Sequence, residues 1–365
     1  MNQRTLGITG ALAAVLLIIA VAVIIGEARS VRPDAEGPLF PGIEDRLHQV
    51  ARITITTGQT SFSLEDKNGD WVMPERSDYP VDLEKARDLV ASFAAATRAE
   101  AKTDKPALYR EIGVDEPSKD AMARKVELDD ANGSVIADVI IGKRQKTVGA
   151  PETAGTFVRI EGEPRAWLVD GLADVSDRPV HWLKPDFIQL SPARVMSVTV
   201  DHPADDKAGE DVTVYKDKPT DAHYRVKDLP KTHQMRSAGA ADSLARALAS
   251  VSFEDVTKAG DRPDMPVTTV TFRTFDGLVL TLSITGTDGN HWATVKAAVD
   301  NDLRKSFAEG EGAAAIPASE DVTKEAADLN ALLSGWSYHL PRFKALDLLK
   351  YKHSFITPIT QKESP

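Results

Sequence analysis

The sequence predicts an α+β fold in which an N-terminal transmembrane helix precedes two similar β-rich α+β units. Each unit is expected to hold an antiparallel or mixed sheet with one packed helix. Three observations predict this class. Residues 6–25 are apolar and uncharged. Short segments that alternate apolar and polar residues follow them, and the order of these segments recurs roughly 135–155 positions further along the chain.

Residues 1–30 are predicted to form an N-terminal tail and a transmembrane signal anchor. At a rise of about 1.5 Å per residue, the apolar run reaches roughly 30 Å, which matches the hydrocarbon core of a bilayer. A cleaved signal has a shorter apolar region of about 7–15 residues, so a retained anchor is favoured over cleavage. The short tail and its signal-like position favour a single pass with the tail inside and the body outside, which the resemblance described below places in the bacterial inner membrane with a periplasmic body. The predicted membrane-anchor residues are Leu6, Leu12, Leu16, Ile19 and Ile25.

The composition of the chain limits its partners. The formal net charge is −11, and this argues against nucleic acid as a partner, because nucleic acid selects basic surfaces. The chain contains no cysteine, which excludes disulfides, thiol nucleophiles and thiolate metal sites. The bilayer itself is an expected partner through the N-terminal helix.

The first α+β repeat unit is predicted over residues 45–190, after a linker at residues 31–44. Asn132-Gly133 stands between two alternating runs, a strong signal for a hairpin in which both turn residues have positive φ. Asp82 is a predicted helix N-cap. The expected elements are a strand at 52–56, a hairpin region at 61–72, a helix with Leu83, Ala86, Val90, Phe93 and Thr97 on one face, strands at 125–128, 135–141 and 156–160, and a Trp-containing closing segment at 181–187.

The second α+β repeat unit is predicted over residues 191–350, and a C-terminal tail follows at 351–365. Asp276-Gly277 marks the corresponding hairpin. An extra helix is expected near residues 319–334, with Ser319 as its N-cap and Gly335 as its end. The other expected elements are strands at 194–200, 212–215 and 223–226, a helix with Leu244, Leu248 and Val251, strands at 269–273, 278–284 and 291–295, an exposed loop at 297–317, and a Trp-containing closing segment at 335–343.

The motifs that could carry chemistry have simpler structural explanations. Residues 310–315 fit a dinucleotide-binding pattern but lie in an acidic, Gly-rich stretch, which indicates a linker. Residues 66–70 resemble part of a calcium loop, yet a hairpin turn explains them. The acidic loop at 201–211 is interpreted as solvated, and the five tryptophans as packing residues. We therefore predict no catalytic, cofactor-binding or metal-binding residues and no cofactor.

The order of features in the first half resembles a bacterial domain-of-unknown-function family of single-span, repeat-containing envelope proteins. The motifs that carry the resemblance are Trp71-Val-Met-Pro74, Ile112-Gly113-Val114-Asp115-Glu116-Pro117, Ile141-Gly142, Phe157-Val-Arg159 and Trp167-Leu-Val169. The likeness covers residues 45–190 well and the second half loosely. Members are often encoded beside gliding-motility-type ABC transporters, so the resemblance implies permease and auxiliary membrane subunits as partners and supplies no catalytic residue.

Two functional hypotheses follow. The first is a membrane-anchored periplasmic accessory or scaffold subunit, not an enzyme, which acts in an ABC-type transporter complex by binding protein or envelope polymer. The alternative is a membrane-anchored envelope hydrolase with a site in the cleft between the units. A cluster of acidic residues with His181 or His339 would favour the alternative.

Overall fold

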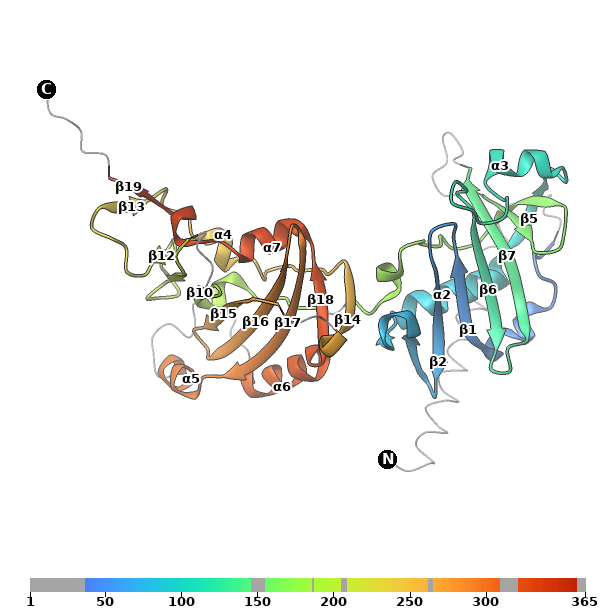
Figure 1. Ribbon diagram of the computed structural model, residues 1–365. Helices are drawn as coiled ribbons and strands as arrows, with labels where there is room; N and C mark the ends of the chain where they lie inside the picture. Colours follow the sequence, from blue (N-terminus) through green and yellow to red (C-terminus); the bar gives the residue numbers. More distant parts are fainter. Residues whose placement is uncertain are drawn as a thin grey trace, which may run out of the picture. The chain divides into compact units, whose positions relative to one another are not determined.

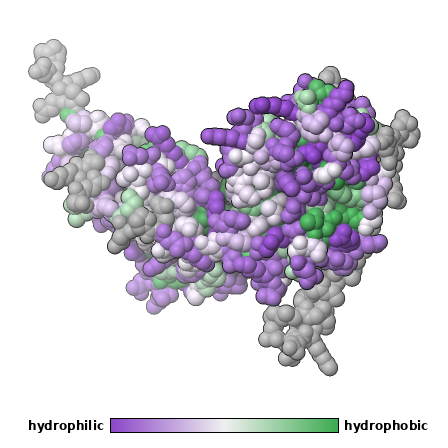
Figure 2. Space-filling view, turned by 45° about the vertical axis from the view of Figure 1, so that its right-hand side comes forward, coloured by the Kyte–Doolittle hydropathy of each residue, from purple (hydrophilic) through white to green (hydrophobic). Residues whose placement is uncertain are grey.

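The computed structural model describes residues 37–145, 155–185, 187–204, 209–261, 265–308 and 321–359. The chain divides into two compact units, Met1–Lys184 and Pro185–Pro365, and each is described by itself. Figure 1 shows a large twisted sheet in each unit. Hydrophilic residues dominate the face of the molecule seen in Figure 2, and hydrophobic residues form limited patches on it.

The core of unit 1 is a nine-stranded sheet in the order β4-β3-β2-β1-β6-β7-β8-β9-β5, in which every pair of neighbours is antiparallel. The strands are β1 (Val50–Thr56), β2 (Ser61–Lys67), β3 (Asp70–Met73), β4 (Tyr79–Pro80), β5 (Thr97–Ala101), β6 (Arg124–Asp130), β7 (Val135–Arg144), β8 (Thr156–Ile160) and β9 (Ala166–Asp170). The helices are α2 (Leu83–Ala95) and α3 (Tyr109–Ile112). Helix α2 carries the chain from β4 at one edge of the sheet to β5 at the other.

Unit 2 is built on an eight-stranded sheet in the order β12-β11-β10-β15-β16-β17-β18-β14, again with antiparallel neighbours. Its strands are β10 (Val195–Asp201), β11 (Val212–Tyr215), β12 (Arg225–Val226), β14 (Asp255–Lys258), β15 (Val267–Thr274), β16 (Leu278–Thr287), β17 (Asn290–Val299) and β18 (Trp336–Leu340). Strands β13 (His233–Met235) and β19 (Ile356–Pro358) form a separate pair. The helices are α4 (Asp242–Ala245), α5 (Asn301–Ala308), α6 (Val322–Leu333) and α7 (Arg342–Leu348).

The two sheets have the same topology. If β10 is matched to β1, the order β3-β2-β1-β6-β7-β8-β9-β5 of unit 1 becomes β12-β11-β10-β15-β16-β17-β18-β14 of unit 2, and only β4 lacks a counterpart. The pairing of the first strand also shifts register at the same place, between Val50 and Arg52 in unit 1 and between Val195 and Ser197 in unit 2. A shared irregularity of this kind marks equivalent positions, because a bulge is a specific feature of a strand pair.

The predicted fold class is wrong as stated. The described chain is β-rich, and its two large sheets are entirely antiparallel, both where a hairpin turn joins neighbouring strands, as in β6–β7, and where a longer connection does, as in β1–β6. No helix among the described residues is long and apolar enough to cross a membrane. The predicted anchor, with Leu6, Leu12, Leu16, Ile19 and Ile25, lies outside the described residues.

The first helix is confirmed with the expected cap, since the Asp82 carboxylate accepts from the Lys85 backbone N–H and Leu83–Ala95 follow. The placement of Thr97 on its face is wrong, because the helix ends at Ala95 and Thr97 begins β5. The helix expected around Leu244 is wrong in length, since α4 has only four residues. The extra helix is confirmed as α6, although its N-cap is Asp321, whose carboxylate accepts from two backbone N–H groups. The expected cap Ser319 lies outside the described residues.

Other corrections concern the ends of the two units. The Trp-containing segments at 181–187 and 335–343 are not equivalent, because Trp336 begins β18, whose counterpart is β9 with Trp167. Residues 301–308 of the expected loop form helix α5. The hairpin at Asn132-Gly133 forms, but only its glycine has positive φ. The Asp130 carboxylate accepts from the backbone N–H groups of Asn132 and Ser134, and this shapes a longer turn.

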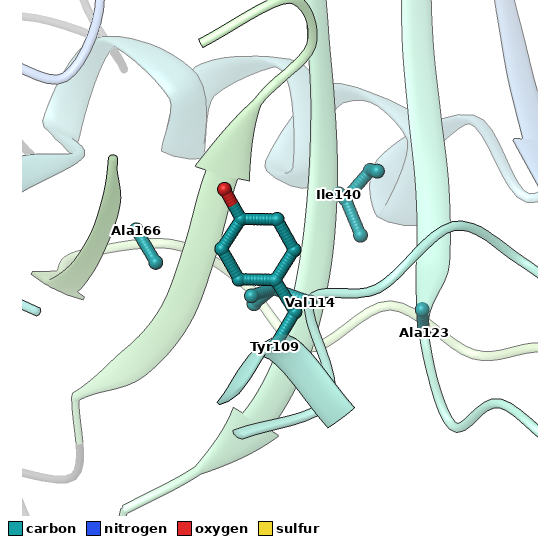
Figure 3. Packing of buried hydrophobic residues seen from close by; sticks show 5 residues of the cluster. All are labelled: Tyr109, Val114, Ala123, Ile140 and Ala166. Carbon is teal, nitrogen blue, oxygen red and sulfur yellow. The ribbon is translucent and has the colours of Figure 1, made fainter. Parts of the chain in front are cut away.

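The Gly-Val-Asp-x-Pro motif of the first half has a packing role. Gly113 ends α3 at φ 74°, and the Val114 side chain is fully buried. The Arg159 guanidinium lies over the Tyr109 ring, donates to the Val114 carbonyl and pairs with Glu116. Figure 3 shows the resulting cluster, in which the buried members are Tyr109, Val114, Ala123, Ile140 and Ala166. The motif thus holds residues 109–117 against the strands.

Candidate functional site

A cavity of unit 1 lies beside the N-terminal half of α2. Its volume is about 450 Å³, and it opens to solvent. One wall comes from α2, and the other comes from the segment between β9 and the end of the unit. The lining residues are Lys85, Asp88, Leu89, Ala173, Asp174, Ser176, His181 and Trp182. Both walls lie within the same unit, so its fold positions the site.

Hydrogen bonds within the second wall fix its shape. Ser176 Oγ lies 2.7 Å from His181 Nδ1 and also accepts from the Arg178 backbone N–H at 3.2 Å. The Trp182 indole N–H donates to the Ser176 carbonyl at 2.9 Å. These bonds close a short loop ahead of the 3₁₀ helix Pro179–Trp182 and hold the imidazole beside the cavity.

A lysine joins the two walls. Lys85 Nζ donates to the His181 carbonyl at 3.1 Å and pairs with the Asp82 carboxylate at 3.0 Å. The rim therefore combines cationic and anionic groups, because Asp88 and Asp174 also line the cavity. Leu89 and Trp182 are buried and supply an apolar floor. An apolar floor with a few polar groups above it is typical of a ligand-binding pocket.

The Ser176–His181 pair could in principle act on a bound ester or amide, because a nucleophile needs a base within hydrogen-bond reach. The contact, however, runs through Nδ1 between residues five positions apart in one loop. The same serine oxygen accepts the Arg178 N–H, which stabilises the loop. The geometry therefore suits a binding wall better than an activated nucleophile.

A second cavity of about 270 Å³ lies in unit 2. It is lined by Pro203, Pro266, Thr268, Ile284, Gly286, Thr287, His291 and Leu349. Burial lowers the pKa of His291, and the neighbouring His339 lowers it further. The imidazole is consequently neutral at neutral pH, so this cavity carries no fixed charge on its histidine.

Some of the segments discussed from the sequence reach the cavities, since the acidic loop at 201–211 contributes Pro203 to the unit 2 cavity, and His181 and Trp182 line the unit 1 cavity. Asp66 accepts from the Gly69 backbone N–H in the β2–β3 turn, as expected of a hairpin. His223 pairs with Asp242 at 2.8 Å, and His233 belongs to β13. Residues 310–315 and 205–208 are outside the described part of the chain. Within that part, no three His, Asp or Glu residues gather in a way that could hold a metal ion.

Two adjacent aspartates at the end of β6 differ in their electrostatics. Burial raises the pKa of Asp129, which is 5% exposed, against the opposing effect of Arg52. Hydrogen bonds from the backbone N–H groups of Ser134 and Asn132 lower the pKa of Asp130. Asp129 thus favours folding below its ordinary pKa of 3.8 and loses this contribution as the pH rises through its raised value. Asp130 favours folding above 3.8 and loses this contribution as the pH falls through its lowered value.

We expect the variants Asp129→Asn and Asp130→Asn to change stability in opposite directions at neutral pH. Asp129→Asn removes a buried charge and should raise the urea midpoint, whereas Asp130→Asn replaces a charged turn acceptor by a neutral amide oxygen, which weakens the bonds from the Asn132 and Ser134 N–H groups and should lower the midpoint. Urea titrations of the full chain between roughly pH 3 and pH 7 should show both differences shrinking toward acid pH. Changes of the same sign in the two variants would contradict this assignment.

Comparison with known proteins gives one match. A family model described as a domain of unknown function, DUF4340, covers residues 71–269, which is more than half of the chain. The chain belongs to this family. The expected resemblance to a bacterial family of unknown function is therefore confirmed. No curated protein and no solved structure matches the chain.

The DUF4340 region begins in β3 and ends in β15. It contains α2, the Gly-Val-Asp-x-Pro motif and both walls of the unit 1 cavity. Sequence reasoning identified α2 and His181 but did not bring them together. The sequence feature that could have located the α2 wall of the cavity is the predicted N-cap Asp82, because a helix that begins after it carries Lys85 and Asp88 in its first two turns.

Proposed function

We propose that this chain is a binding and scaffolding subunit of a bacterial envelope assembly, which acts through contacts with protein or envelope polymer rather than through catalysis. The observation that carries the proposal is the unit 1 cavity, with charges of both signs around an apolar floor. Such a lining suits a polar chain segment, because it offers pairing for charged groups and burial for apolar ones.

The assembly that we propose is an ABC-type transporter complex on the periplasmic side of the inner membrane. The support is the resemblance in residues 45–190, which implies permease and auxiliary membrane subunits as neighbours. The acidic net charge agrees with a protein or neutral polymer partner rather than nucleic acid.

The test is purification of the full, tagged chain from its native membranes in mild detergent, followed by quantitative mass spectrometry. Asp88→Lys reverses an exposed charge of the cavity, and Arg87→Glu is the matched control on the same helix outside the lining. We expect ABC permease and ATPase subunits with the wild type and Arg87→Glu, and at least a fivefold lower yield with Asp88→Lys. A chain that is recovered alone would contradict the proposal.

A hydrolase is the second candidate, and the 2.7 Å contact between Ser176 and His181 is the observation that favours it. If the chain cleaves an ester or amide, Ser176→Ala and His181→Ala should each abolish turnover. Under the binding proposal, neither variant changes a rate measured with chromogenic ester and peptide substrates, because the pair only shapes the wall.

A further inference from the structure

The strands of unit 2 form one wall of its cavity of about 270 Å³. Thr268 of β15 lies opposite Ile284 of β16, so the two side chains share one face of the sheet. His291 of β17 lies opposite Gly286, which is two residues beyond Ile284, and it therefore belongs to the same face. Thr268, Ile284 and His291 are 8%, 2% and 9% exposed. These three residues line the cavity from the buried face of the sheet.

Other lining residues come from the loop after β10, the start of β15 and the end of α7. They are Pro203, Pro266 and Leu349. His202 joins the loop to the end of the helix, because its Nε2 lies 3.4 Å from the Leu349 carbonyl oxygen. The His202 ring also stacks on Tyr351, with 3.9 Å between the ring centroids. This part of the wall is therefore preformed, which reduces the ordering that a ligand must impose.

The described residues that line this cavity include no charged side chain. Thr268 and Thr287 supply hydroxyl groups. Burial and the neighbouring His339 lower the pKa of His291, so its imidazole is neutral at neutral pH. The remaining side chains are apolar: Pro203, Pro266, Ile284 and Leu349. An ionised ligand would leave water without an opposite charge to meet it, so the lining favours an uncharged ligand.

The imidazole of His291 has an unused hydrogen-bonding group. Its Nδ1 is buried and has no hydrogen-bond partner among the described residues. Buried polar atoms are nearly always paired, so an unpaired one in a cavity wall points to a ligand. A half-turn about χ2 exchanges the two edges of the ring, so Nδ1 is not confined to the side on which it is buried. A neutral imidazole has one acceptor and one N–H donor, and a hydroxyl group can bond with either.

We propose that the unit 2 cavity binds a small uncharged phenol, whose hydroxyl group bonds with the His291 imidazole and whose ring contacts the apolar lining. An apolar cavity of about 150 Å³ is large enough to hold benzene, so this cavity can hold a benzene ring with a substituent. A phenol combines an apolar body with one polar group and stays uncharged at neutral pH. The site goes beyond the proposed function, because all its lining residues belong to unit 2.

The probe is p-cresol, toluene is the matched probe without a hydroxyl group, and benzoate is the charged one. Binding to the full chain with ¹⁵N-labelled histidine is followed by NMR at neutral pH. We expect p-cresol but not toluene to shift the ring nitrogen signals of His291. The affinity for p-cresol should fall about threefold to tenfold in His291→Leu, which is the contribution of one hydrogen bond, while the affinity for toluene stays within about twofold.

A second pair of variants tests the place of binding. Leu349→Trp puts a larger side chain into the wall of the cavity, and we expect it to weaken p-cresol binding at least about tenfold. Leu346→Trp is the matched control, because Leu346 lies on α7, is 57% exposed and does not line the cavity. The control should bind p-cresol within about twofold of the wild type.

Three results would overturn the inference. They are an unchanged His291 ring signal with p-cresol, wild-type affinity for p-cresol in Leu349→Trp, and binding of benzoate as tight as that of p-cresol. The first is measured on the wild type, so it decides the matter even if a variant does not fold. Purification from native membranes tests the proposed function separately, since its variants lie in unit 1.

Discussion

The Arg194→Met variant is expected to lose about 3–5 kcal/mol of the free energy of unfolding of unit 2, because it leaves the buried Asp276 carboxylate and the half-buried Glu325 carboxylate without their cation. The Arg194 side chain is 8% exposed, and its Nε donates to Asp276 at 2.8 Å. Its two terminal nitrogens donate to the two carboxylate oxygens of Glu325, each at 2.8 Å. Bidentate pairs of this kind are geometrically specific.

The location of these three residues explains the size of the expected effect. Arg194 ends the 3₁₀ helix before β10, Asp276 lies in the β15–β16 turn, and Glu325 lies in the first turn of α6. Burial by itself would lower the pKa of Arg194, but Glu325 and Asp276 outweigh it and raise the pKa. The guanidinium therefore stays charged and connects three elements.

The measurement is chemical denaturation of the full chain with hydrogen exchange of β15, β16 and α6 as the readout for unit 2. The control is Arg273→Met, which breaks the exposed pair with Asp300 at 2.9 Å. Exposed pairs contribute up to about 1 kcal/mol, so the control should remain close to the wild type. Equal losses in the two variants would show that the buried network contributes no more than a surface pair.

The sequence correctly predicted those elements whose ends are determined by residues close to them in the chain. The Asp82 cap and the hairpin at Asn68-Gly69 depend on neighbours a few residues away, and both are present. The helix expected around Leu244 failed because its N-terminal aspartate has distant partners. The Asp242 carboxylate accepts from the Tyr224 N–H and pairs with His223, and the Leu248 carbonyl accepts from Leu190 N–H. Tertiary contacts of this kind override helix propensity.

The candidate site depends on contacts that no local pattern encodes. Lys85 and His181 are 96 positions apart in sequence. Outside the site, the contact between Arg194 and Glu325 spans 131 positions in the same way. Helix α2 and His181 can each be recognised in the sequence. Their contact arises because α2 forms the long crossover between β4 and β5, which places it beside the segment that contains His181.

The Gly142→Ala variant is expected to cost about 1–3 kcal/mol of unfolding free energy, because a methyl group would be forced into a close backbone contact. A Cβ at this position would lie 2.4 Å from the Ile112 carbonyl oxygen and 2.8 Å from the Gly113 carbonyl oxygen. Backbone atoms cannot rotate away as a flexible side chain can. The close contact can therefore be removed only if β7 moves away from the Gly-Val-Asp-x-Pro motif.

The measurement is urea denaturation of the full chain together with the exchange rate of the Val114 amide, which donates to the Tyr109 carbonyl at 3.0 Å. Gly260→Ala is the control, because a Cβ there meets no atom within 4 Å. Faster exchange at Val114 in Gly142→Ala but not in Gly260→Ala would show that the motif packs closely against the sheet because Gly142 has no side chain. Wild-type exchange in both variants would instead mean that the motif is held by Arg159, whose guanidinium spans Tyr109, Val114 and Glu116.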